Sequence, residues 1–249
     1  MEKENHSGIY LLPNLLTTAS LFAAFYSIVS SMKGQYEAAV VAMFIGMIAD
    51  GLDGRIARLT NTQTEFGAQY DSLSDMVTFG VAPSLLLFNF TLSQLGKFGW
   101  LVAFVYTAAV ALRLARFNTQ LETADKRYFQ GLPCPPAAAV MASFVWLCYQ
   151  HEWQNILISI LTSILALSAS ILMVSNLRYY SFKEVDFKGK VPFLYVLVFI
   201  ILIVVIFLNP PIVLFVGFSL FALSGPVCTL LSLRKMRKQR NKSDKEKKQ

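Results

Sequence analysis

The sequence predicts an all-α protein: a polytopic helical membrane protein with about eight transmembrane helices. Of its 249 residues, 55% are apolar and only 15% are charged, and the mean hydropathy is +0.52. The apolar residues form continuous runs of the length that crosses a bilayer as a helix, about 20 residues. A transmembrane β-barrel would instead show alternating segments of about ten residues.

The expected spans cover, in order, residues 10–31, 37–55, 68–91, 98–118, 134–150, 154–176, 191–208 and 211–233. Each is a largely apolar run, and the connections are short, so residues 1–233 are expected to form one membrane domain. The segment before the first span, MEKENHSG, carries acidic as well as basic residues and leads into a long apolar run. This pattern is not typical of a cleavable signal peptide.

The distribution of basic residues predicts the orientation. Eight spans place both termini on one side, and with that side in the cytoplasm Lys33 and Lys97 are the only basic residues in external loops. Basic residues gather in cytoplasmic loops of membrane proteins. We therefore expect an integral protein of the cell (cytoplasmic) membrane with both termini in the cytoplasm.

The last 16 residues, RKMRKQRNKSDKEKKQ at 234–249, contain nine basic and two acidic residues. We interpret them as a disordered cytoplasmic tail that fixes the topology. Attraction to anionic lipid headgroups is a secondary effect, worth about 1 kcal/mol per basic residue near the surface. No aromatic or groove-reading element accompanies the charges, so nucleic acid is not an expected partner.

Cysteine and histidine are too few and too scattered for most catalytic or metal sites. The three cysteines, Cys134, Cys148 and Cys228, lie in or beside apolar spans without metal or disulfide spacing. The two histidines are His6, near the N-terminus, and His151, in an expected external loop. Carboxylates are therefore the side chains that remain for chemistry.

Four aspartates lie within residues 49–80, ADGLDGRIARLTNTQTEFGAQYDSLSDMVTFG. Asp50, Asp53 and Ala57 are spaced for one face of a helix, with Gly54 beside them. Glycine costs a helix interior about 1 kcal/mol relative to alanine, so Gly54 suggests close packing or a ligand. The polar stretch RLTNTQTE, residues 58–65, should end this helix.

The second acidic face follows that turn. Gly67, Asp71 and Asp75 are spaced by four residues on the next helix. Two helices joined by so short a connection lie roughly antiparallel, so the two acidic faces should meet near the cytoplasmic ends of their spans. Four carboxylates there would repel one another and be costly to desolvate.

Three interpretations of the cluster stay open on physical grounds. Divalent cations with hard oxygen ligands, such as Mg²⁺ or Mn²⁺, would compensate the charge, and two adjacent ions suit phosphate chemistry. A transporter would use the acids as a cation site. Arg55 and Arg58 would alternatively pair with some of the acids and fasten the helices.

The spacing of these residues resembles a known signature. Residues 50–75 read D-x2-D-G-x2-A-R-x8-G-x3-D-x3-D without departure, the fixed positions being Asp50, Asp53, Gly54, Ala57, Arg58, Gly67, Asp71 and Asp75. This pattern is similar to that of the CDP-alcohol phosphatidyltransferases, integral membrane enzymes of phospholipid synthesis.

Further stretches resemble the bacterial and archaeal branch of that family that uses serine. They are LPNLLT (12–17), ALRLARFN (111–118), FQGLPCPPAAA (129–139) and LMVSNLRYYSFK (172–183). The resemblance implies a homodimer that transfers the phosphatidyl group of CDP-diacylglycerol to L-serine and releases CMP. The alternatives are the same chemistry with glycerol 3-phosphate or inositol, or a cation transporter.

The resemblance also implies roles for the acids. Asp50, Asp53 and Asp71 would bind two Mg²⁺ or Mn²⁺ ions, and Asp75 would contact the second ion and act as the general base toward the acceptor hydroxyl. The small Gly54 and Ala57 leave room for a nucleotide.

The remaining site residues are expected to meet the two substrates. Arg58 is expected to meet phosphate or cytidine. Asn14 and Thr17 are expected to contact the CDP part of the donor. Alternatively, they form a polar pair that caps or packs the helix. Arg113 and Arg116, followed by Asn118, are expected to bind the serine carboxylate as an arginine fork. Their alternative role is to anchor the helix at the membrane surface.

Overall fold

The computed structural model describes residues 11–120, 128–180, 197, 201 and 204–246. Its helices are α1 (Leu11–Met32), α2 (Tyr36–Leu59), α3 (Glu65–Asp75), α4 (Ala82–Phe90), α5 (Lys97–Gln120), α6 (Cys134–Gln150), α7 (Ile156–Val174) and α9 (Pro210–Glu246). A π-helix, η1 (Met76–Val81), joins α3 to α4, and a 3-10 helix, η2 (Leu92–Leu95), follows α4. Two short strands, β1 (Tyr128–Gln130) and β2 (Arg178–Tyr180), complete the elements.

The predicted all-α class is confirmed, and six of the eight expected spans coincide closely with helical segments, the third of them being α3, η1 and α4 together. The last expected span begins as predicted, but its helix continues well past residue 233. Most of the expected span 191–208 lies outside the described residues. Five described segments are long and apolar enough to cross a membrane: Leu11–Met32, Glu65–Phe90, Lys97–Thr119, Ile156–Val174 and Pro210–Thr229. Helix α2 is less apolar because it carries the charged residues of the aspartate motif, and α6 has 17 residues.

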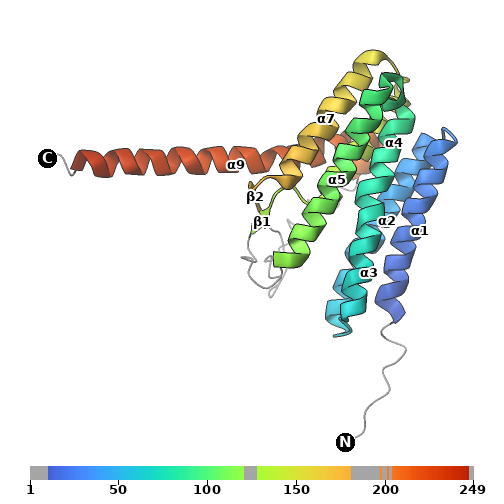
Figure 1. The fold of residues 1–249 in the computed structure, drawn as a ribbon, viewed down its shortest axis with the longest axis horizontal. Coiled ribbons are helices and arrows are strands. Elements are labelled where there is room, and N and C mark those ends of the chain that lie inside the picture. Colours follow the sequence, from blue (N-terminus) through green and yellow to red (C-terminus); the bar gives the residue numbers. More distant parts are fainter. Residues whose placement is uncertain (1–10, 121–127, 181–196, 198–200, 202–203, 247–249) are drawn as a thin grey trace, which may run out of the picture.

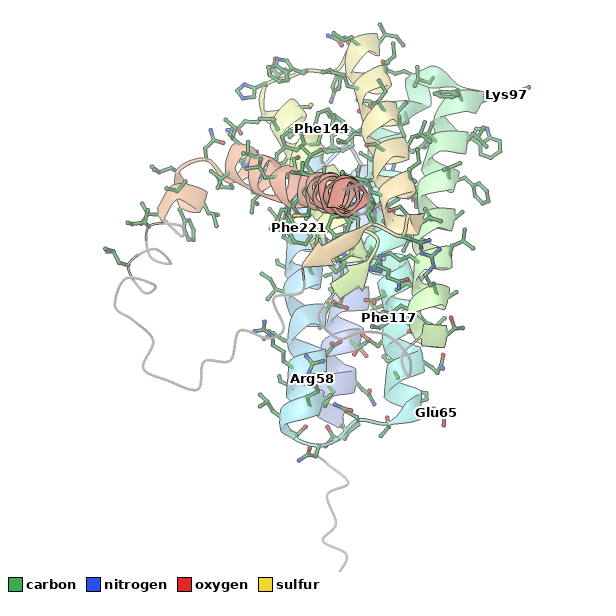
Figure 2. All side chains as sticks on the ribbon, turned by 90° about the vertical axis from the view of Figure 1, so that its left-hand side faces the viewer. Arg58, Glu65, Lys97, Phe117, Phe144 and Phe221 are labelled. Atoms are coloured by element: carbon green, nitrogen blue, oxygen red, sulfur yellow. The ribbon has the colours of Figure 1, made fainter. Side chains whose placement is uncertain are left out.

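The helices α1, α2, α4, α5 and α7 run side by side as a bundle (Figure 1). Arg58, Glu65 and Phe117 lie toward one end of it and Lys97 lies at the other (Figure 2). The chain therefore reverses direction between consecutive elements, as expected for successive spans. The core lies among α4, α5 and α6 and includes Leu86, Val110 and Met141, each buried.

Small side chains bring α1 and α2 into close contact. Gly46 of α2 faces α1 so closely that an added Cβ would lie 3.3 Å from the carbonyl oxygen of Ser20 and 3.4 Å from the Cβ of Ala23. Small residues at such interfaces let helix backbones approach. This contact holds the N-terminal half of α1 against the acidic face of α2.

An antiparallel ribbon connects the end of the bundle to α9. Strand β1 pairs with β2, with Phe129 opposite Tyr179. The buried Tyr179 donates its hydroxyl to the carbonyl oxygen of Ala222 on α9 at 2.9 Å. Burial raises the pKa of Tyr179 to about 12.

Helix α9 departs from the sequence prediction in two ways. It crosses the bundle at a steep angle, and its C-terminal part projects away from it (Figure 1). It also continues to Glu246, whereas residues 234–249 are predicted to be disordered. The residues after position 233 contain no Gly or Pro and are rich in Lys, Arg and Gln, which are strong helix formers, so the helix has no local reason to stop.

Candidate active site

The first half of the site is the C-terminal half of α2. Asp50 and Asp53 lie one turn apart, and Asp53 is buried. Gly54 follows them and is loosely packed. Apart from its chain neighbours and the backbone of its own helix, the nearest described atom to an added Cβ would be Nη1 of Arg58, at 3.9 Å. Internal packing therefore does not require a glycine at position 54.

A capped turn presents the second half of the site. Helix α2 ends at Leu59, and Asn61 takes a positive φ of 52°, a conformation that asparagine tolerates better than most residues. Thr64 then caps α3 by accepting a hydrogen bond from the backbone N–H of Gly67 at 3.0 Å. Such a cap contributes about 1 kcal/mol to helix stability. The polar turn expected at residues 58–65 is thus confirmed.

The two acidic faces meet as predicted. Asp50 and Asp53 from α2 and Asp71 from α3 each place one carboxylate oxygen within 4.8 Å of the others. Carboxylate oxygens at this spacing suit hard divalent cations such as Mg²⁺ and Mn²⁺. These three residues form the part of the cluster that can surround a single ion.

Asp75 lies beside this group at a break in helical geometry. Its carboxyl is within hydrogen-bonding range of Asp50, and it is the last residue of α3 before η1 begins at Met76. Single π-helical turns inserted in α-helices are frequent at functional sites. The wider turn of η1 changes the rotation between Asp75 and the residues of α4. The sequence did not predict this π-helix.

Two oxygens of the cluster are buried without a partner. Oδ1 of Asp71 and Oδ1 of Asp75 receive no hydrogen bond from the residues that the structure describes. A buried carboxylate oxygen left unpaired is costly, so a compensating group is required. Neither arginine of α2 supplies it, because Arg55 and Arg58 are exposed and do not bond to these atoms. The donor set and the unpaired oxygens therefore fit a divalent cation.

The residues expected at the nucleotide lie on α1 next to the cluster. Thr17 is buried and its Oγ1 lies 2.6 Å from Oδ2 of Asp53. Asn14 lies one turn earlier, near Gly67, where an added Cβ would be 3.5 Å from Oδ1 of Asn14. The structure therefore joins Thr17 directly to an acid and leaves Asn14 at the start of α3.

The two arginines of α5 have different surroundings. Arg113 is buried and donates from Nε to the carbonyl oxygen of Leu132. Arg116, one turn later, donates from Nη1 to Oδ1 of Asn176 at 3.2 Å. Asn118 exchanges hydrogen bonds with Ser72 of α3 at 3.0 and 3.4 Å. The two guanidinium groups thus do not form a single fork.

Comparison with known proteins identifies the family. A family model described as CDP-alcohol phosphatidyltransferase matches residues 10–174.

The chain belongs to the CDP-alcohol phosphatidyltransferase family.

Individual relatives support this assignment. The chain is 37% identical over 240 residues to the CDP-diacylglycerol--serine O-phosphatidyltransferase of Helicobacter pylori, covering 94% of this chain and 98% of the relative. It is 33% identical over 164 residues to the enzyme of the same name from Methanocaldococcus jannaschii, covering 66% and 74% of the two chains. It is 32% identical over 181 residues to the archaetidylserine synthase of Methanothermobacter thermautotrophicus, covering 72% and 73%.

In this CDP-alcohol phosphatidyltransferase the structure adds residues to the site that the motif does not contain. Ser74 of α3 is buried and donates to the backbone carbonyl of Thr17 at 3.3 Å. Tyr70 exchanges a hydrogen bond with Thr18 at 2.9 Å. Asn176 lies within the quoted stretch 172–183, so the sequence offered a signal for it. Nothing in the sequence distinguished Ser74 or Tyr70 from other polar residues of α3.

Proposed function

We propose that this chain transfers the phosphatidyl group of CDP-diacylglycerol to the hydroxyl of L-serine, giving phosphatidylserine and CMP. The observation that carries the proposal is the convergence of Asp50, Asp53 and Asp71, with unpaired buried oxygens on Asp71 and Asp75. The names of the relatives support serine as the acceptor.

The aspartates are proposed to hold two divalent cations, Mg²⁺ or Mn²⁺. Asp50, Asp53 and Asp71 would hold the metals, and Asp75 would also contact the second ion. Bound there, the cations would neutralise the pyrophosphate and the charge that develops on the departing CMP.

Asp75 is proposed to accept the proton of the serine hydroxyl as that oxygen attacks phosphorus. Its unpaired Oδ1 leaves an acceptor atom available for that proton. A direct, single displacement is favoured because His151 lies beyond the opposite end of α6.

The nucleotide is proposed to lie along α2, beside Gly54 and Ala57. An added Cβ at Gly54 would meet only the tip of Arg58, and one at Gly51 would meet nothing within 4 Å, so this face of α2 is open in the described structure. Arg58 can then reach a phosphate, and Asn14 lies at the neighbouring end of α1. Arg116 and Asn118 are proposed to bind the serine carboxylate at the end of α5.

The membrane arrangement is proposed to be a homodimer of polytopic chains with both termini in the cytoplasm. The acids then lie near the cytoplasmic surface. The lipid tails of the donor remain in the bilayer, while serine arrives from the aqueous side.

The test is CMP release by the purified protein in detergent, supplied with CDP-diacylglycerol and either Mn²⁺ or Mg²⁺. L-Serine, glycerol 3-phosphate and inositol are offered separately, and a parallel sample contains EDTA. Release with serine alone, abolished by EDTA and restored by excess metal, is expected. Release with another acceptor would overturn the serine assignment. Metal-dependent cation flux in sealed vesicles without CMP release would favour a transporter.

A further inference from the structure

Thr17 contacts both halves of the aspartate cluster from a third helix. Its Oγ1 has two acceptors within reach: Oδ2 of Asp53 at 2.6 Å and the carbonyl oxygen of Pro13 at 3.1 Å. A hydroxyl has one proton to donate. The shorter contact goes to a group that is charged when ionised, and charge-assisted hydrogen bonds are both shorter and stronger. The proton is therefore assigned to Asp53.

The backbone of the same residue contacts α3. The carbonyl oxygen of Thr17 accepts a hydrogen bond from Oγ of Ser74 at 3.3 Å. Ser74 directly precedes Asp75 and lies one turn after Asp71 on the same helix. One residue of α1 thus contacts an acid of α2 through its side chain and the neighbour of an acid of α3 through its main chain.

The surroundings of Thr17 make it rigid enough to fix other groups. Its side chain is 4% exposed and β-branched, so its χ1 is restricted by burial and by its own shape. The close approach of Gly46 to Ser20 holds α1 against α2 one turn further along. Carboxylates that repel one another tend to rotate apart unless such contacts hold them.

We propose that Thr17 is a positioning residue. Its side chain sets the orientation of Asp53, and its main chain, through Ser74, sets the position of Asp75 relative to α1. The cluster is thereby arranged for cations before they bind. The proposal rests on the proposed function only in taking these acids as cation ligands. It departs from the expectation that Thr17 contacts the CDP group. Partners that orient a metal ligand typically change metal affinity by about 10- to 100-fold when removed.

The experiment compares Thr17→Val, Thr17→Ser and Thr18→Val with the unaltered full-length protein in detergent. Valine keeps the shape of threonine and removes the hydroxyl, whereas serine keeps the hydroxyl. Thr18 is the matched control, because its hydroxyl reaches the carbonyl oxygen of Asn14 at 2.7 Å and Tyr70 of α3 at 2.9 Å but no acid. Binding of Mn²⁺ alone, without lipid or serine, is measured from the electron paramagnetic resonance signal of the free ion.

The expected result is that Thr17→Val weakens Mn²⁺ binding at least tenfold, while Thr17→Ser and Thr18→Val stay within about threefold of the unaltered protein. Unchanged Mn²⁺ affinity in Thr17→Val would overturn the proposal. If the loss appears only as a raised KM for CDP-diacylglycerol, Thr17 is a nucleotide contact instead. Absence of Mn²⁺ binding by the unaltered protein would instead overturn the metal site itself, and the proposal with it.

The contact with Ser74 gives a second test that does not depend on the Thr17 variants folding. Ser74→Ala removes the hydrogen bond to Thr17 without altering any acid. Because Ser74 precedes Asp75, we expect kcat to fall about two- to tenfold with little change in the KM for serine. An unchanged kcat would show that the position of Asp75 does not depend on the hydrogen bond from Ser74 to the carbonyl oxygen of Thr17. It would remove that part of the proposal.

Discussion

Nη1 of Arg116 donates a hydrogen bond to Oδ1 of Asn176 at 3.2 Å, across 60 positions of sequence. This contact joins the end of α5 to the chain that follows α7. Arg113, one turn earlier, is instead buried and bonded through Nε to the carbonyl oxygen of Leu132. Arg113 therefore contacts the segment before α6, whereas Arg116 contacts the chain after α7.

Arg116→Ala is expected to raise the KM for L-serine about tenfold or more and to change the KM for CDP-diacylglycerol much less. A hydrogen bond to a charged group contributes about 1.5–3 kcal/mol, which corresponds to this range. The measurement is CMP release as a function of each substrate. Asn176→Ala serves as the control for loss of the inter-segment contact. Equal loss for both substrates would mean that Arg116 is structural.

Asp75→Asn is expected to abolish turnover while leaving CDP-diacylglycerol binding largely intact. The amide nearly matches the carboxylate in shape but cannot accept the serine proton as a base. Turnover is measured by CMP release and binding by equilibrium titration of the lipid nucleotide. A variant that still turns over would remove Asp75 as the base. One that is inactive because it no longer binds the donor would make Asp75 a binding residue.

Gly54→Ala is expected to weaken CDP-diacylglycerol binding without destabilising the protein. Apart from its chain neighbours and the backbone of its own helix, no described atom lies closer than 3.9 Å to the added Cβ, and alanine favours a helix over glycine by about 1 kcal/mol. The matched control is Gly217→Ala in α9, where an added Cβ meets nothing within 4 Å and no substrate is expected. The measurements are the midpoint of thermal unfolding in detergent and the KM for CDP-diacylglycerol. A stable variant with unchanged KM would place the nucleotide elsewhere.

Gly225→Ala is expected to destabilise the contact between α9 and the β-ribbon. An added Cβ would lie against three ring carbons of Tyr179, closer than van der Waals contact allows. Overpacking of this kind costs about 1–3 kcal/mol, which exceeds the gain in helix propensity. The midpoint of thermal unfolding in detergent should fall. Tyr179→Phe, which removes only the hydroxyl bonded to Ala222, should lower it less.

Much of the fold was predictable because the local rules apply to it directly. Continuous apolar runs placed six spans close to their observed bounds, and the polar stretch with Asn61 and Thr64 marked the turn between α2 and α3. The steep course of α9 was not predictable, because an apolar run specifies that a helix is buried in lipid or protein but not its angle. Residues 234–246 are helical because Lys, Arg and Gln favour a helix, whereas their high charge predicted disorder.

The sequence by itself determined that four aspartates stand at helical spacing on two consecutive helices, with small residues beside them. This pattern is sufficient to predict that their carboxylates meet. Only the tertiary structure decided which groups support those acids. Thr17 reaches the acids from α1 and bonds to Ser74 of α3, and Asn176 reaches Arg116 from a distant segment. The π-helix after Asp75 was likewise not evident from the sequence. Periodicity along one chain records which face a residue occupies, whereas a contact between helices depends on their separation and rotation, which no single segment encodes.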